Sequence, residues 1–209
     1  MEVLSHRGLW ETAEEKNTAA AFRRSFDLGF GTETDIRDHD GEIVIAHDMP
    51  AGNEMRLAEL LALMAGRNLA LALNIKADGL GERAREILAA FGHTNYFVFD
   101  MALPDLVHQL GCGLPVFTGL SDLQPYPPLL ADCEGVWLDC FRSDWFGPGL
   151  LDGLTGDGKR VCVVSADLHQ RDIDTQWSII KLAKCVNENS LLLCTDVPEK
   201  ARSYFGEAR

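Results

Sequence analysis

The sequence predicts a compact (β/α)8 barrel of the TIM type, and three observations lead to this fold class. Short apolar runs that read as strands recur along the chain, and segments with helical spacing of apolar residues lie between them. Strands that alternate with helices form parallel sheets. Eight such units fit a chain of 209 residues, which is near the lower limit for this barrel. An open, doubly wound sheet is the competing architecture. We expect residues 1–209 to form a single domain.

The expected strands are short and largely apolar. Nine runs qualify, and the third reads as an extension of the second, which leaves eight barrel strands. The runs are Val3–Ser5, Gly31–Arg37, Ile43–Ala46, Leu69–Lys76, Tyr96–Asp100, Pro115–Thr118, Gly135–Asp139, Arg160–Ser165 and Leu191–Thr195.

Apolar residues at intervals of three and four predict helices between these strands. The clearest examples are the segments 19–26, 57–64, 80–91 and 173–180. Asn17 or Thr18 is placed to cap the first of these helices, and Asp172 is placed to cap the last. The fifth unit is the weakest, because the sequence QPYPP at 124–128 breaks any helix. We therefore expect a barrel with an irregular or missing fifth helix.

The charge of the chain excludes some classes of partner. The net charge is −13, and 24% of the residues are charged. Nucleic acids require a basic face, so we expect no nucleic-acid partner. No apolar run approaches the length that a transmembrane helix needs, so we expect no transmembrane segment.

The cysteines favour a reducing compartment. All six are scattered, without a C-x-x-C pair, and several lie in apolar runs where cysteine packs as a small hydrophobe. The first ten residues, MEVLSHRGLW, lack the basic region and apolar core of a signal peptide. We expect a cytoplasmic protein.

Polar side chains gather where the expected strands end, which is the end of a barrel that carries the working groups. An ordinary apolar core would not place so many polar groups at matched positions. They are His6, Glu33, Asp35, Arg37, His47, Asn74, Lys76, Asp100, Asp139, Ser165 and Thr195.

Glu33 and Asp35 predict a cation site. Residues at i and i+2 of a strand share one face, about 6–7 Å apart, and two buried carboxylates cannot both stay ionised without a cation nearby. Their oxygens suit Mg²⁺ or Ca²⁺. The alternative is that the two acids form interior ion pairs with Arg37 and Lys76.

His6 and His47 suit a general acid and a general base, because histidine titrates near neutrality. Arg7 and Lys76 are candidates for phosphate contacts. The structural alternatives are that the histidines are ordinary strand-end residues and that the two cations neutralise the nearby acids.

The stretch from Ser5 to Asp48 resembles the glycerophosphodiester phosphodiesterase family. Four ordered motifs carry the resemblance: His6-Arg7-Gly8, Asn17-Thr18, Glu33-Thr34-Asp35 and His47-Asp48. The resemblance implies a TIM barrel in which His6 and His47 exchange protons with the attacking hydroxyl and the leaving alcohol. It also implies a divalent cation, Mg²⁺ or Ca²⁺, held by Glu33, Asp35 and a third residue two positions before Lys76.

This chain departs from the family pattern at two positions. The third ligand position is Asn74, where the family has an acid, so we expect weaker metal affinity. The acid that precedes asparagine-threonine in the family is replaced by Lys16. After Lys76 the resemblance fades, and it returns faintly at 195–198 (TDVP).

Asp100 and Asp139 end two later strands and are candidates for binding substrate hydroxyls or for replacing the missing metal charge. Helix capping is their structural alternative. His169 follows the seventh strand and can reach the barrel mouth, whereas His39, His93 and His108 fit surface or packing roles.

These observations favour a metal-assisted phosphodiesterase acting on a small (glycero)phosphodiester. One alternative is a phospholipase-C-like lyase that forms a cyclic phosphate with the same two histidines. Another is a noncatalytic barrel that binds a phosphorylated or sugar ligand. The expected partner is a small-molecule diester, and the sequence leaves the oligomeric state open.

Overall fold

The structure is a computed structural model that describes residues 1–206. The chain divides into two compact units. The N-terminal unit comprises His6–Val116, and the C-terminal unit combines Met1–Ser5 with the residues from Phe117 onward. We describe each unit by itself, and the single domain over residues 1–209 stays a prediction.

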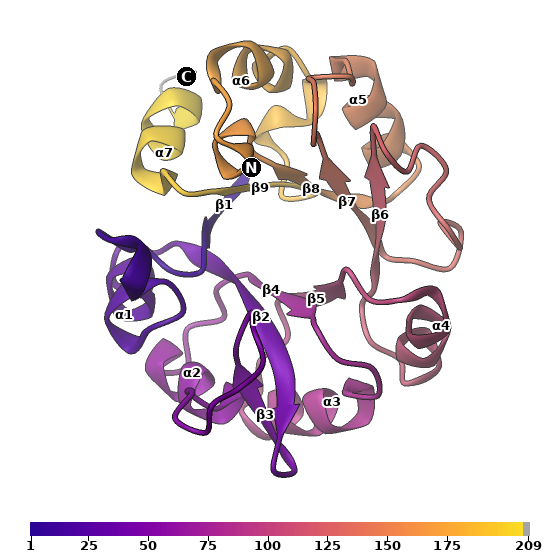
Figure 1. Cartoon of the computed structure of the whole chain (residues 1–209). Helices are drawn as coiled ribbons and strands as arrows, with labels where there is room; N and C mark the ends of the chain where they lie inside the picture. The colour runs from indigo at the N-terminus through magenta and orange to yellow at the C-terminus, as the bar shows by residue number, and fades with distance from the viewer. Residues whose placement is uncertain (207–209) are drawn as a thin grey trace. The chain divides into compact units, whose positions relative to one another are not determined.

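The N-terminal unit contains a parallel sheet with the strand order β5-β4-β2. Strand β3 pairs antiparallel with β2, which is why the third run reads as an extension of the second. The helices lie along one side of these strands in Figure 1. The strands are β2 (Gly31–His39), β3 (Glu42–Ile45), β4 (Leu71–Ile75) and β5 (Tyr96–Phe99). The helices are α1 (Ala19–Asp27), α2 (Leu57–Met64), α3 (Gly81–Ala90) and α4 (Leu103–Gly111), preceded by the short 3-10 helix η1 (Ala13–Glu15).

The C-terminal unit contains a second parallel sheet with the order β1-β9-β8-β7-β6. Its strands are β1 (Glu2–His6, whose last residue belongs to the N-terminal unit), β6 (Phe117–Ser121), β7 (Gly135–Asp139), β8 (Arg160–Val164) and β9 (Leu191–Thr195). Its helices are α5 (Pro148–Gly156), α6 (Asp174–Lys181) and α7 (Pro198–Gly206), with the 3-10 helices η2 (Ala166–His169) and η3 (Lys184–Asn187). Trp177 is fully buried in the core of this unit and packs against Tyr204 and Phe205.

The alternation of strands and helices confirms the α/β class, and the fifth helix is missing as expected. No helix is described between β6 and β7, where residues 122–134 form turns and irregular structure. Thr118 Oγ1 donates a hydrogen bond of 2.8 Å to the carbonyl oxygen of Pro128, which holds this segment against β6. The prolines remove backbone donors and exclude the helical conformation here.

Two local predictions were wrong. The strand expected at Pro115–Thr118 is β6, Phe117–Ser121, because Pro115 has no N–H group to donate to a ladder. Asp172 does not cap α6, since the N-cap is Ile173. The Asp172 carboxylate instead accepts a hydrogen bond of 2.8 Å from the backbone N–H of Asp174.

Two further observations concern the chain as a whole. None of the helices within residues 1–206 is long and apolar enough to cross a membrane. No disulfide joins the six cysteines, all of which lie in the described part, and five of them are buried.

Candidate active site

The site begins at His6-Arg7-Gly8, where β1 ends and a turn follows. Arg7 has a φ of 60° and Gly8 a φ of 83°, so two successive residues adopt the left-handed conformation. The backbone N–H of Arg7 donates to the carbonyl oxygen of Glu33 at 2.9 Å, and that of Gly8 donates to Thr32 Oγ1 at 3.0 Å. These bonds fix the turn against β2 and thereby place the His6 and Arg7 side chains beside the acids of that strand.

Replacing Gly8 by alanine is expected to destabilise the protein by at least about 2 kcal/mol. A Cβ atom at this position would lie 2.8 Å from two atoms of Ala21, one of them in the backbone, and the φ of +83° is itself strained for alanine. Urea denaturation monitored by circular dichroism measures the change. Gly29→Ala is the matched control, because its φ is +80° but no atom lies within 4 Å of the added Cβ. Equal losses in the two variants would contradict the close approach at Gly8.

Asp35 lies at the centre of the site and contacts several of its residues. It is completely buried. Its Oδ2 atom lies 2.8 Å from Arg7 Nε and accepts a hydrogen bond of 3.2 Å from Asn17 Nδ2, and its Oδ1 atom lies 3.8 Å from Lys76 Nζ. The fold therefore brings four groups together: the acid Asp35 from β2, the cations Arg7 and Lys76 from the ends of β1 and β4, and the amide of Asn17 from the segment before α1.

Glu33 lies beside His6. Glu33 is 2% exposed, and its Oε2 atom is 3.8 Å from His6 Nε2. Burial raises the pKa of the Glu33 carboxyl to about 7, opposed first by the attraction of His6 and reinforced by the nearby charge of Asp35. A carboxyl with this pKa holds a proton under mildly acidic conditions and releases it when a cation is present.

Three buried oxygens on the same strand pair lack hydrogen-bond donors. They are Glu33 Oε2, Asp35 Oδ1 and Asn74 Oδ1. Asp35 and Asn74 are register partners across β2 and β4, and neighbouring partners project to the same side of a sheet. Buried acceptors normally have a partner, so these oxygens fit a hard cation such as Mg²⁺ or Ca²⁺. Within residues 1–206 no group of three or more histidine, cysteine or acidic side chains has the geometry of a metal site. Histidine, cysteine and acidic side chains alone therefore do not form a metal site in this part of the chain, and the proposed ligand set needs the amide oxygen of Asn74.

The stability of the metal-free protein is expected to fall as the pH rises from about 4.5 to about 7. Because the pKa of Glu33 is raised in the folded state, that state binds the proton more tightly than the unfolded chain between these two values. The stabilisation is complete below the unfolded pKa and is lost as the pH rises through the folded pKa. Melting temperatures in EDTA across this range, compared with those of Glu33→Gln, measure the effect. If the melting temperature of Glu33→Gln depends on pH in the same way as that of the wild type, Glu33 is not the source of the pH dependence.

Lys76 and Asp100 form a second pair at the edge of the site. Lys76 Nζ lies 3.1 Å from Asp100 Oδ2, and the side chain of Asp100 is 56% exposed. Lys76 thus contacts both Asp35 and Asp100, as the ion-pair alternative anticipated. Arg37 does not join the acids, because its Nε donates to the carbonyl oxygen of His47 at 3.0 Å.

His47 begins the loop after β3. The backbone N–H of its neighbour Ala46 donates to the carbonyl oxygen of Asp35 at 3.0 Å, so the loop starts beside Asp35. The imidazole is half exposed, and its Nδ1 atom lies 2.9 Å from Asp48 Oδ1. Its carboxylate partner is thus Asp48 rather than an acid of β2. Convergence of the two imidazoles stays a prediction.

Asp139 lies in the C-terminal unit, at the end of β7. Its Oδ1 atom accepts a hydrogen bond of 2.6 Å from the Cys140 N–H and lies 2.6 Å from His169 Nε2. Burial raises the pKa of the Asp139 carboxyl, and the hydrogen bond from His169 opposes this shift. The side chain has the local bonds of a loop-stabilising residue, and its contact with substrate stays a prediction.

Asn17 is a site residue that the sequence indicated as a possible helix cap and as part of the Asn17-Thr18 motif, without a role in the site. Thr18 is the N-cap of α1, and its side chain accepts a bond from Ala21. Asn17 has a φ of 61°, donates to Asp35 and accepts a hydrogen bond of 2.8 Å from Thr34 Oγ1. Its place in an asparagine-threonine motif was the available signal, but the contact with Asp35 spans 18 residues and no local pattern reports it.

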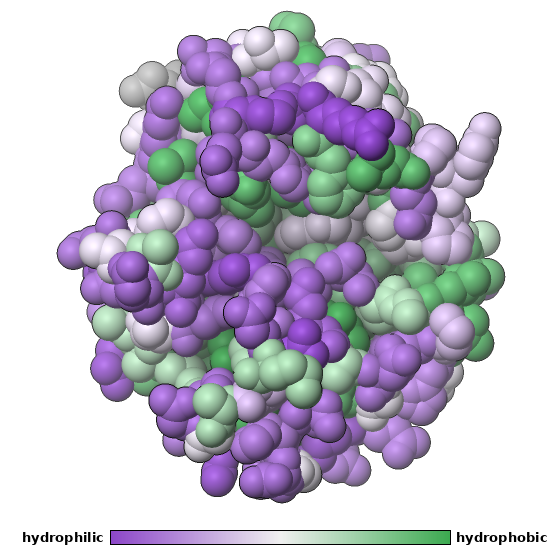
Figure 2. Space-filling model, in the orientation of Figure 1, coloured by the Kyte–Doolittle hydropathy of each residue, from purple (hydrophilic) through white to green (hydrophobic). Residues whose placement is uncertain are grey.

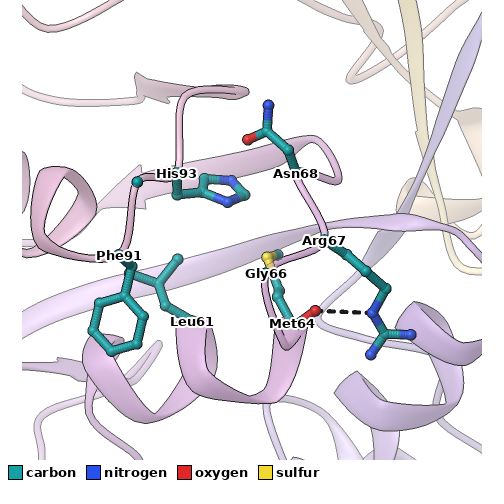
Figure 3. A pocket seen from close by; sticks show the side chains of 8 residues that line it. Leu61, Met64, Gly66, Arg67, Asn68, Phe91 and His93 are labelled. Carbon is teal, nitrogen blue, oxygen red and sulfur yellow. Dashed lines mark hydrogen bonds between the residues drawn. The ribbon is translucent and has the colours of Figure 1, made fainter.

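A small cavity in the same unit lies away from this site (Figure 3). It is lined by residues of the α2–β4 and α3–β5 connections, including Met64, Asn68 and His93, and measures about 30 Å³. These connections precede the strands, so the cavity lies at the opposite end of β4 and β5 from Asn74 and Asp100. Desolvation lowers the pKa of the buried His93, which supports a packing role.

Known proteins resemble this chain in structure rather than in sequence. No model of a known family and no curated protein matches the chain. A glycerophosphodiester phosphodiesterase from Agrobacterium tumefaciens superposes with a TM-score of 0.73 at 14% identity, over 99% of each chain. A phosphodiesterase from Oleispira antarctica, in complex with the product sn-glycerol 3-phosphate, gives a TM-score of 0.69 at 17% identity, over 99% of this chain and 97% of that one. Dihydropteroate synthase from Thermus thermophilus is more distant, with a TM-score of 0.50 at 14% identity, over 97% of this chain and 91% of that one.

Two of these structures carry the activity that the sequence motifs had suggested. At these identities the likeness shows the fold alone. Three observations point to the same fold. They are the strand order within each unit, the helix that follows every parallel strand but one, and the match over nearly the full length of these structures. The chain therefore has a TIM-barrel-like α/β fold, shared with structures of phosphodiesterases.

Proposed function

We propose that the protein is a metal-assisted phosphodiesterase that hydrolyses a small glycerophosphodiester. The observation that carries this proposal is the set of three buried, unsatisfied oxygens on Glu33, Asp35 and Asn74 beside the imidazole of His6. The likeness to two phosphodiesterase structures supports the same chemistry.

The residues divide into two roles around a bound diester. Glu33, Asp35 and Asn74 would hold Mg²⁺ or Ca²⁺, which when bound draws in phosphate oxygens and stabilises the negative charge that develops on them. Arg7 lies against Asp35 Oδ2, and Lys76 Nζ lies 3.8 Å from Asp35 Oδ1. Both cations would donate to the remaining phosphate oxygens.

Two histidines would move the protons. One imidazole accepts the proton of the attacking water as its oxygen bonds to phosphorus, and the other donates a proton to the departing alcohol oxygen as the P–O bond breaks. His6 is held against Glu33 for one of these roles, and His47, at the start of the β3–α2 loop, is the proposed partner. The products are an alcohol and a linear phosphate monoester.

A screen of phosphodiesters tests this function. We expect the purified protein to release a linear monoester such as sn-glycerol 3-phosphate, detected by ³¹P NMR, when Mg²⁺ or Ca²⁺ is present and not in EDTA. Failure to cleave any diester with either ion would overturn the proposal and favour a barrel that only binds phosphorylated ligands.

A cyclising lyase is the second candidate, and one observation favours it. Asn74 contributes no charge, and Asp35 is already paired with Arg7, so this site relies less on a cation than one with three acids. Accumulation of a cyclic phosphate, with activity retained in EDTA, would identify the lyase.

Replacing Asn74 by aspartate is expected to tighten Mg²⁺ binding at least about tenfold, because it adds one negative charge at an existing ligand position. Isothermal titration calorimetry measures the affinity. Asn74→Leu is the matched variant and should weaken binding, since it removes the oxygen. Unchanged affinity in both variants would remove Asn74 from the ligand set.

A further inference from the structure

Lys76 lies between two acids and donates a hydrogen bond to only one of them. Its Nζ atom is 3.1 Å from Asp100 Oδ2 but 3.8 Å from Asp35 Oδ1. The first distance is that of a hydrogen bond, and the second is too long for one. The ammonium group therefore binds Asp100 and leaves Asp35 Oδ1 without a donor.

This choice is unexpected, because Asp35 is the buried acid of the two. Asp35 is completely buried, and a buried acceptor without a donor costs more free energy than an exposed one. Asp35 Oδ1 is nevertheless one of the oxygens that lack a hydrogen-bond partner. The outer part of the site is open to water: the Asp100 side chain is 56% exposed, and hydrophilic residues cover most of the surface over β2 in Figure 2.

The backbone places Lys76 on the face that carries the proposed cation ligands. Its N–H donates to the carbonyl oxygen of Ile36 at 3.0 Å, which continues the pairing of β2 with β4 beyond the last residue of β4. Lys76 follows Asn74 by two residues, and residues two apart on a strand project to the same side. Both strands that flank β4, which are β2 and β5, offer this side chain an acid.

Asp100 has a backbone conformation that few residues other than glycine adopt. It is the first residue after β5, and its φ is 68°, in the left-handed region. Strained residues of this kind cluster at functional sites, and the ends of barrel strands are where such sites lie. The strained residue of β5 is also the one that binds Lys76.

We propose that Asp100 is a positioning residue, which holds the Lys76 ammonium group away from Asp35 Oδ1 and so keeps this oxygen free for the divalent cation. The inference rests on the proposed function, from which the cation is taken. Without the Asp100 carboxylate, the ammonium group would move onto Asp35 Oδ1 and compete with the cation for that oxygen. With it, the ammonium group stays at the edge of the site and can donate to a phosphate oxygen.

A double-mutant cycle measured by isothermal titration calorimetry with Mg²⁺ and Ca²⁺ tests this role. In Asp100→Asn we expect the affinity for the ion to fall by about tenfold or more, the effect of one hydrogen bond to a charged group. In Lys76→Met/Asp100→Asn no ammonium group can compete, so the affinity should match that of Lys76→Met within about twofold. If Asp100 bound the cation directly, its loss would weaken binding equally in both backgrounds. Equal losses, or an unchanged affinity in Asp100→Asn, would overturn the inference.

A crystal structure of Asp100→Asn grown in EDTA tests the same role without any bound ion. We expect Lys76 Nζ to lie within about 3.2 Å of Asp35 Oδ1, and an ammonium group that has not moved toward Asp35 would overturn the inference. The movement, in a protein whose wild type cleaves no diester, would support the positioning role while the proposed function fails. Diester hydrolysis by the wild type, with Lys76 unmoved in the variant, would reject the positioning role and leave the function standing.

Discussion

Replacing His6 by alanine is expected to lower turnover of a glycerophosphodiester at least about a hundredfold, the smallest effect usual for a positioned acid–base group. The physical reason is its contact with Glu33, 3.8 Å between Nε2 and Oε2, which sets the imidazole beside the proposed cation ligands. Initial rates at saturating substrate measure the effect, and the melting temperature should change little because the side chain lies at the end of β1 and is partly exposed.

His47 and His108 provide the comparison. His47→Ala should show a loss of the same order if the two imidazoles share the proton transfers, although its partner in the structure is Asp48. His108→Ala, on an exposed turn of α4, should retain wild-type turnover. Full activity in His47→Ala would refute the two-histidine scheme and leave His6 to act alone or with water.

Replacing Asp35 by asparagine is expected to lower the free energy of unfolding by about 3 kcal/mol, the usual cost when one partner of a buried ion pair is removed. Asp35 is completely buried and pairs with Arg7 at 2.8 Å, so the variant leaves the guanidinium without its carboxylate. Turnover should also collapse, because the residue is a proposed cation ligand. Urea denaturation in EDTA isolates the structural loss from that of the metal.

Asp100→Asn is the matched control for this prediction. Asp100 pairs with Lys76 at 3.1 Å, but its side chain is 56% exposed, so its loss should cost less than about 1 kcal/mol. If the two variants lose the same stability, the burial of Asp35 does not determine the strength of its ion pairs.

The sequence predicted the features that depend on local pattern. The alternation of apolar runs and helical spacing predicted eight parallel strands, and the prolines of the segment 124–128 predicted an irregular or missing fifth helix. The i and i+2 spacing of Glu33 and Asp35 placed both acids on one face of β2. The glycine after Arg7 was part of a motif, and its left-handed φ beside α1 gives the physical reason for it.

Contacts between distant segments could not be predicted in this way. Asn17 donates to Asp35, and the ammonium group of Lys76 lies near the carboxylates of both Asp35 and Asp100. The periodicity of apolar residues indicates which face of a strand or helix a residue occupies. It does not indicate which distant residue contacts it in the folded protein. For the same reason the sequence left Asp139 open between a substrate contact and a helix cap, and its pairing with His169 of η2 could not be read from it.

A divalent-ion titration tests the central claim most directly, that the oxygens of Glu33, Asp35 and Asn74 hold a cation beside His6. Thermal denaturation at pH 7.5 is measured with increasing Mg²⁺ or Ca²⁺ for the wild type and for Glu33→Gln. We expect both the wild-type melting temperature and the rate of diester hydrolysis to rise together with the same ion concentration, and the variant to show neither change. A melting temperature that is independent of both ions in the wild type, or an equal shift in the variant, would contradict the account.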